Sequence, residues 1–138
     1  MIIILLIFFM IMFIVRMDQS PLVTEVLRRY KVLRDNCEGK FQRLKNPVII
    51  TFFKQGLVYK SLGYNVNKGE EIGICVDGTP NDIFHVLLHE LAHSTVAEYS
   101  HNEEFWNNFS ELCQHCIKLG IYEKTEKTKF CGGTISDN

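Results

Sequence analysis

The sequence predicts a single α+β domain that follows a short apolar segment. Helical periodicity marks both ends of the domain, and three β-rich segments lie between them without a repeat or a low-complexity linker. The length of 138 residues suits one hydrophobic core. Hydrophobic residues make up 46% of the chain, and about 39% once the first fifteen positions are left out, which is ordinary for a globular domain. Disorder, collagen-like repeats and a protein with several membrane spans are therefore excluded.

The first helix of the domain is expected to begin at Ser20 and Pro21. Serine is a preferred helix cap, and proline is favoured in the first turn. Apolar residues then recur at helical spacing to about Leu44, where residues 46–47 (Asn-Pro) break the pattern. The β-branched and aromatic run at 48–53 predicts the first strand.

Short strands and turns follow in the middle of the chain. We expect a second strand ending at Tyr59 and a hairpin over residues 63–76, with its turn at 67–69 (Asn-Lys-Gly). The loop at 77–80 (Asp-Gly-Thr-Pro) ends this part of the chain.

Two amphipathic helices complete the domain. Asn81 or Asp82 is expected to cap the first, and the second spans about 102–119 and is stopped by Gly120. The remaining tail is expected to add one short strand.

The amino terminus predicts a membrane anchor. Residues 1–15 are uninterruptedly apolar and are followed by Arg16. No basic residue precedes the run and no small-residue cleavage site follows it, which argues against a secretory signal peptide. We therefore expect residues 1–16 to anchor a domain at 17–138, facing the cytosol because the positive charges lie after the run. A start at Met17 would instead give a soluble cytoplasmic or nuclear chain.

The net charge of -1 conceals an asymmetry between the two halves of the chain. Residues 21–60 carry nine basic and three acidic side chains, whereas residues 61–138 carry five basic and twelve acidic ones. The basic stretch from Arg28 to Lys60 could bind DNA or anionic lipid headgroups, or it could neutralise the acidic half within the fold.

A cytosolic domain would keep its five cysteines reduced. Cys113 and Cys116 have the spacing of zinc and redox motifs, but they fall within a predicted helix and no second pair accompanies them. We interpret them as buried free thiols. Reduced thiols are expected at Cys37, Cys75, Cys113, Cys116 and Cys131.

The most informative motif is His89-Glu90-Leu91-Ala92-His93. Histidines at positions i and i+4 share one helix face, so two ring nitrogens can converge on one Zn²⁺ ion. Glu90 lies about 100° around the helix, where it can act as a general base rather than as a ligand.

A catalytic zinc site usually takes three protein ligands. His101, which follows a short loop after His93, is the leading candidate for the third. Glu104, Glu111 and His115 are alternatives on the next helix. His85, one turn before His89, is expected to support the ligands or to line the site.

Three blocks in order resemble the WLM family of zinc metallopeptidases, which is related to the SprT-like proteases. The blocks are the hairpin GYNVNKGEEIGICV, the helix LLHELAH, and the segment HNEEFW. The resemblance covers about residues 45–115 and implies that His89, His93 and His101 bind zinc while Glu90 is the general base. Seven residues separate His93 from His101, two more than the family pattern has.

The resemblance implies a minimal zincin (minigluzincin-like) core. Such a core has an N-terminal helix, a small and mostly antiparallel sheet, the active-site helix and a following helix, with the strand before the active-site helix free to pair with an extended substrate. The implied activity is metalloendopeptidase hydrolysis by Glu-assisted attack of a zinc-bound water, on DNA-crosslinked or other proteins. Tyr99, His85 and Tyr122 are candidates for stabilising the oxyanion. The alternative is a non-catalytic, zinc-stabilised binding module that could associate with nucleic acid.

Overall fold

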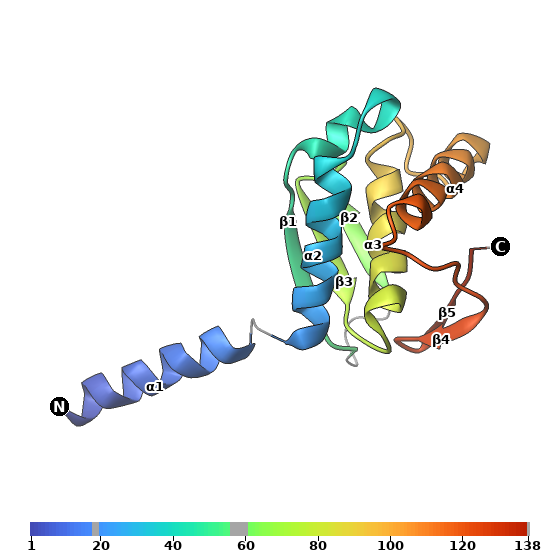
Figure 1. Cartoon of the computed structure of the whole chain (residues 1–138). Coiled ribbons are helices and arrows are strands. Elements are labelled where there is room, and N and C mark those ends of the chain that lie inside the picture. The colour runs from blue at the N-terminus through green and yellow to red at the C-terminus, as the bar shows by residue number, and fades with distance from the viewer. Residues whose placement is uncertain (18–19, 56–60, 138) are drawn as a thin grey trace.

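The computed structural model describes residues 1–17, 20–55 and 61–137, and it confirms the α+β class (Figure 1). Helices and strands are segregated along the chain: three strands lie between two groups of helices, and two short strands follow the last helix. The helices are α1 (Ile2–Met17), α2 (Pro21–Asp35), the 3-10 helix η1 (Gly39–Lys45), α3 (Pro80–His93) and α4 (Glu103–Lys118). The strands are β1 (Ile49–Phe53), β2 (Gly63–Val66), β3 (Glu71–Cys75), β4 (Thr128–Phe130) and β5 (Gly133–Ile135).

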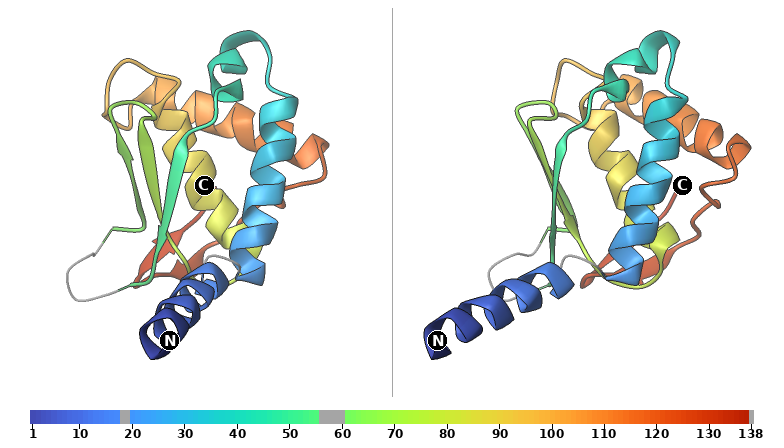
Figure 2. Two further views of the ribbon diagram at one scale, coloured as in Figure 1. Left: turned by 90° about the vertical axis from the view of Figure 1, so that its left-hand side faces the viewer. Right: turned by 60° about the vertical axis from the view of Figure 1, so that its left-hand side comes forward.

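The main sheet has three strands in the order β1-β3-β2. β3 pairs with β1 in parallel and with β2 in antiparallel, and β4 with β5 forms a separate antiparallel hairpin. The three-stranded sheet is therefore mixed, with one pairing of each kind. α2 and α3 lie on one face of the sheet (Figure 2). Ile72 and Ile74 of β3 point into this layer and are fully buried against the helices. The motif from His89 to His93 lies on α3, whose apolar residues form the centre of the core.

The first helix of the domain ends earlier than the sequence predicted. α2 begins at Pro21 as predicted but ends at Asp35, and Asn36 is its C-cap. Gly39 then has a φ of +60°, a left-handed conformation that glycine adopts without strain, and the chain continues as η1. Apolar spacing alone did not reveal this break, because η1 also buries its Phe41.

The cap of α3 is Thr79 rather than Asn81 or Asp82. The Thr79 hydroxyl accepts from the Asp82 amide, and the Asp82 carboxylate accepts in return from the Thr79 amide. Asn81 instead joins the helix start to the tail, because it bonds to the backbone of Glu123 in both directions. α4 agrees with the sequence: Asn102 caps it through the Phe105 amide.

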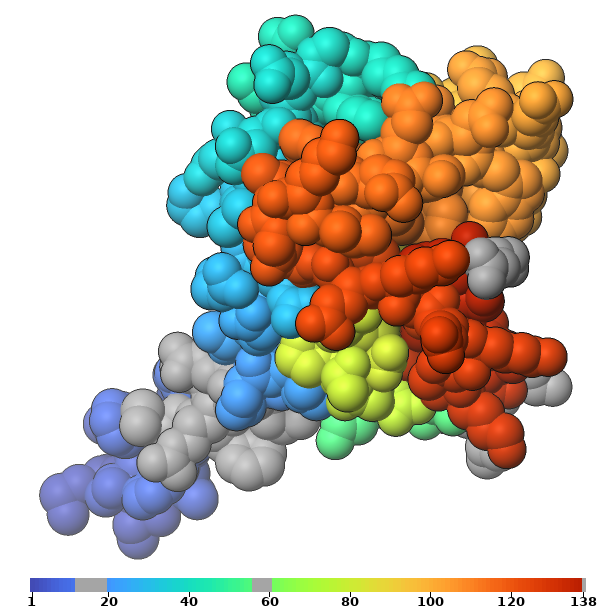
Figure 3. All heavy atoms as spheres, turned by 45° about the vertical axis from the view of Figure 1, so that its right-hand side comes forward, coloured from blue at the N-terminus to red at the C-terminus, as the bar shows by residue number. Residues whose placement is uncertain are grey.

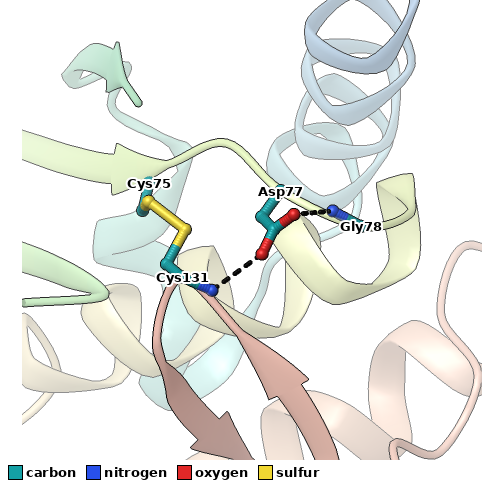
Figure 4. Close-up of a disulfide and its surroundings, with 4 residues drawn as sticks. All are labelled: Cys75, Asp77, Gly78 and Cys131. Carbon is teal, nitrogen blue, oxygen red and sulfur yellow. Dashed lines mark hydrogen bonds between the residues drawn. A yellow bond between two sulfur atoms is a disulfide. The ribbon is translucent and has the colours of Figure 1, made fainter. Parts of the chain in front are cut away.

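The tail forms two strands instead of one, and a disulfide attaches their hairpin to the sheet. Cys75 at the end of β3 is bonded to Cys131 at the β4-β5 turn (Figure 4). The Asp77 carboxylate accepts hydrogen bonds from the amides of Cys131 and Gly78. The expectation of reduced thiols was therefore wrong for this pair, whose members are 56 residues apart in sequence and meet only in the fold. The other three cysteines are free and buried, as predicted.

The expected single-pass membrane anchor is also wrong. α1 has 16 residues, or about 24 Å of helix, against roughly 30 Å of hydrocarbon in a bilayer. Among the described residues, no helix combines the length and the apolarity needed to cross a membrane. α1 extends away from the domain in every view, and its side chains at residues 1–11 are exposed (Figures 1 and 2). The predicted strand ending at Tyr59 lies outside the described residues.

Candidate metal centre

Three histidine side chains converge at one point on the surface of α3. The Nε2 atom of His101 lies 3.1 Å from Nε2 of His89 and 3.0 Å from Nε2 of His93. Ligand atoms in a tetrahedral zinc site, with bonds of about 2.0–2.1 Å, lie about 3.3 Å apart. The three nitrogens can therefore hold one metal ion, and imidazole donors suit zinc and other transition metals. The structure thus brings together the three histidines that the sequence predicts as ligands.

The environment of the two helical histidines keeps them neutral. Burial and the neighbouring imidazoles lower the pKa of His89 to about 3. Burial, with charges on His101 and Lys68, lowers the pKa of His93 to about 4. A ring nitrogen must be unprotonated to bind a metal ion. In the metal-free protein, the rings of His89 and His93 therefore stay able to bind a metal ion well below neutral pH.

Glu90 shares the cavity with the histidines. Its side chain is buried and lines a cavity of about 440 Å³, and burial raises the pKa of its carboxyl to about 7. Within the described part of the chain, no hydrogen bond or ion pair engages this carboxyl group. Gly63 of β2 packs directly over it, because a Cβ there would lie 3.2 Å from Cγ of Glu90 and 2.9 Å from Cγ1 of Val86. The close approach of β2 thus needs a glycine at Gly63.

The β2-β3 hairpin caps the C-terminal end of α3. The last carbonyl groups of a helix have no partner within it. Asn65 donates to the Glu90 carbonyl at 2.7 Å and to the Ser94 hydroxyl at 2.8 Å, while its own carbonyl accepts from the Gly69 amide at 2.8 Å. One side chain therefore joins the hairpin turn to the helix segment that carries Glu90 and His93.

Lys68 in the same turn holds the loop that carries His101. Its ammonium donates to the carbonyls of His93 at 3.1 Å and Glu98 at 2.7 Å, and it lies 3.9 Å from the centre of the Tyr99 ring. The positive charge at the end of α3 also complements the helix dipole. These contacts hold the loop of seven residues that returns His101 to the centre.

The other candidates for the third ligand lie elsewhere. His115 hydrogen-bonds to the Asn36 carbonyl at 2.9 Å, and Glu111 forms an ion pair with Lys40 at 2.8 Å. Glu104 is exposed on α4 and does not line the cavity. Among the described residues, His89, His93 and His101 form the group of three or more potential ligands that could hold a metal ion.

Further residues line the cavity around the histidines. Leu62, Gly63 and Asn65 form the side next to β2, Trp106 comes from α4, and the tail contributes Thr134, Ile135 and Ser136. His85 and Tyr99 also line it, whereas Tyr122 does not, so two of the three oxyanion candidates reach the cavity.

The sheet edge that could pair with an extended peptide is not the strand that the sequence predicted. β3, the strand before α3, is paired on both sides, and the edge strand beside the cavity is β2.

The basic residues between Arg28 and Lys60 are largely engaged within the protein. Arg28 and Arg29 pair with Glu25, and Lys31 pairs with Asp35. DNA binding by this stretch stays a prediction.

Comparison with known families agrees with the geometry. The WLM domain matches residues 54–137, which include the hairpin, α3, α4 and the tail. The chain belongs to the WLM family. WLM domains are associated with metallopeptidase-like function, and the three histidines in this member have the arrangement that a metal site requires.

Two viral proteins are similar to this WLM chain, and both are described only as uncharacterized. The first, from Acanthamoeba polyphaga mimivirus, is 31% identical over 100 residues, which is 64% of this chain and 51% of the relative. The second, from Invertebrate iridescent virus 6, is 39% identical over 46 residues, or 33% of this chain and 26% of the relative. The chain thus spans about half or less of the length of these relatives. No solved structure gave a significant match.

Proposed function

We propose that this chain is a zinc-dependent metalloendopeptidase with a minimal zincin core. The observation that carries the proposal is the convergence of three Nε2 atoms in the cavity that also holds the Glu90 carboxyl. A purely structural zinc site has no use for an unpaired carboxyl beside it. WLM family membership supports the same reading.

His89, His93 and His101 would hold the ion. Zinc at this position supplies Lewis-acid activation of water and of a peptide carbonyl. Glu90 takes the proton from the attacking water and returns it to the departing amine, and its buried, weakly acidic carboxyl suits both transfers.

The substrate would bind in extended form along β2. Cys75 donates its amide to the Leu62 carbonyl, so the antiparallel alternation directs the backbone groups of Gly63 and Asn65 away from β3. Both residues line the cavity. A peptide that adds to this edge through backbone hydrogen bonds would pass over the three histidines. An unfolded protein segment, including one crosslinked to DNA, fits this description.

The test is zinc-dependent cleavage of an unfolded protein by the full chain and by Glu90→Gln, with DNA present and absent. We expect Glu90→Gln to retain one zinc per chain and to lose at least 100-fold in cleavage rate, in line with the usual contribution of a general base. Stoichiometric zinc with no cleavage by the wild-type chain would favour the zinc-stabilised binding module instead. Cleavage by Glu90→Gln at the wild-type rate would remove Glu90 from the mechanism.

A further inference from the structure

His85 is a buried imidazole in the cavity wall that the proposed metal chemistry does not use. It lies on α3 one turn before His89, is 4% exposed, and lines the cavity. Its Nδ1 atom lies 2.9 Å from Oδ1 of Asp137 and 2.9 Å from the Tyr122 hydroxyl. In the described part of the chain, no partner is found for its Nε2 atom. A polar atom on the wall of a substrate cavity is therefore left available.

The contacts around Nδ1 determine which nitrogen carries the proton. The Tyr122 hydroxyl has one hydrogen, which it donates to Oδ1 of Asp137 at 2.5 Å. Both neighbours of Nδ1 thus present acceptor atoms, and Nδ1 must be the donor. Burial acts to raise the pKa of Asp137, but the hydrogen bonds from His85, Tyr122 and the Thr125 amide more than offset it and hold that pKa below its usual value. In the neutral ring, Nε2 consequently carries the lone pair.

The tail that holds His85 is firmly attached to the domain. The Asp137 carboxylate also accepts from the Thr125 amide at 2.9 Å, and the Asp137 amide donates to the Thr125 carbonyl at 3.1 Å. The Cys75–Cys131 disulfide fixes the hairpin that precedes these residues. In Figure 3 this segment, in red, lies against α4 on one face of the molecule. The orientation of His85 is thus set before any substrate binds.

We propose that His85 is a selectivity residue whose Nε2 accepts a hydrogen bond from a hydroxyl or amide side chain of the substrate, on the residue about two positions from the bond that is cut. The proposal rests on the proposed peptidase function. Residues one turn apart on a helix face have Cβ atoms about 5–6 Å apart, and an extended peptide advances about 3.3 Å per residue. At that spacing, the substrate residue about two positions from the carbonyl at the three histidines comes opposite His85.

The charges around the cavity favour a neutral donor. A substrate carboxylate has no hydrogen to donate to the lone pair of Nε2, and it would be repelled by the carboxylate of Asp137, which lies 2.9 Å from Nδ1 of the same ring. A substrate ammonium would lie close to the ion held by the three histidines. Threonine, serine, asparagine and glutamine supply a donor hydrogen without a charge.

The test measures binding to the zinc-loaded Glu90→Gln full chain, so it does not depend on turnover. The probes are fluorescent ten-residue peptides built around one fixed central bond. They differ only in carrying threonine or valine, which have the same shape with and without a hydroxyl, at the first or the second position on either side of that bond. We expect the threonine peptide to bind about tenfold more tightly at one flanking position, as one hydrogen bond to a buried acceptor allows. Asp and Lys peptides at that position are expected to bind more weakly than threonine.

Two matched variants separate selectivity from structural support. His85→Asn keeps a donor near the Nδ1 position but lacks an atom near Nε2. This variant is expected to bind threonine and valine peptides with equal affinity while keeping most of the thermal stability. His85→Gln has its amide near the Nε2 position and is expected to retain part of the ratio.

The outcomes that overturn the proposal are distinct from those that overturn the peptidase assignment. Equal binding of threonine and valine peptides, a preference for a charged side chain, or no binding of any peptide would each overturn it. An unchanged ratio in His85→Asn, with lost stability, would make His85 a structural residue. Selective binding with no cleavage by the wild-type chain would contradict only the peptidase function.

Discussion

Asn65 offers the sharpest test of how the hairpin supports the metal centre, and the change is Asn65→Ala. The substitution removes three hydrogen bonds, of 2.7, 2.8 and 2.8 Å, to Glu90, Ser94 and Gly69. At about 1 kcal/mol for each net bond, the free energy of unfolding should fall by about 3 kcal/mol. For a chain of 138 residues this corresponds to a decrease in Tm of about 10 °C.

Thermal and urea unfolding of the metal-free protein, followed by circular dichroism, measures this loss. Asn107→Ala is the matched control, because Asn107 is exposed on α4 and the same change there should stay within about 0.5 kcal/mol. Asn65→Asp keeps the acceptor for the Gly69 amide but loses both donors, so it should be destabilised as well. An Asn65→Ala protein as stable as the Asn107→Ala control would refute the capping role.

Three other predictions concern the loop, the tail and the buried carboxyl. Lys68→Met removes the hydrogen bonds that hold the His101 loop and should weaken zinc binding about tenfold, as measured by competition with a chelator; unchanged affinity would show that the loop needs no such support. The double variant Cys75→Ser, Cys131→Ser lacks the disulfide that closes a loop of 56 residues, so its unfolded chain gains entropy. Its free energy of unfolding, measured by denaturant titration, should be about 4 kcal/mol lower than that of the wild type, and a decrease below about 1 kcal/mol would contradict this. The pKa of Glu90 is raised to about 7, so the fold holds a proton that the unfolded chain releases near pH 4.5, and stability falls as pH rises between these values. The difference in unfolding free energy between metal-free Glu90→Gln and the wild type should therefore change with pH. It should favour the variant by up to about 3 kcal/mol more at pH 8 than at pH 4, and a difference that does not change with pH would argue against the raised pKa.

The elements with strong local signals were predictable from the sequence. The i, i+4 spacing of His89 and His93 needs only a helix to place both rings on one face, and the cap at Asn102 with the stop at Gly120 bounded α4. The hairpin turn at residues 67–69 was likewise visible, and Asn67 and Lys68 have the positive φ angles that its geometry requires.

Features that depend on distant residues were not predictable. Cys75 and Cys131 approach only after the tail folds against β3, and Asp137 meets His85 across 52 positions of sequence. The roles of Asn65 and Lys68 also depend on where the hairpin lies relative to the end of α3. The only signal for them was their place within the motif that resembles the WLM family.

The most direct measurement of the central claim is X-ray absorption at the zinc edge on the zinc-loaded full chain, with zinc content determined in parallel. We predict one zinc per chain, held by three imidazole nitrogens at about 2.0–2.1 Å, and loss of one of them in His101→Ala. Sulfur ligands at about 2.3 Å, which only cysteines such as Cys113 and Cys116 could supply, or an unchanged spectrum in His101→Ala, would contradict the account.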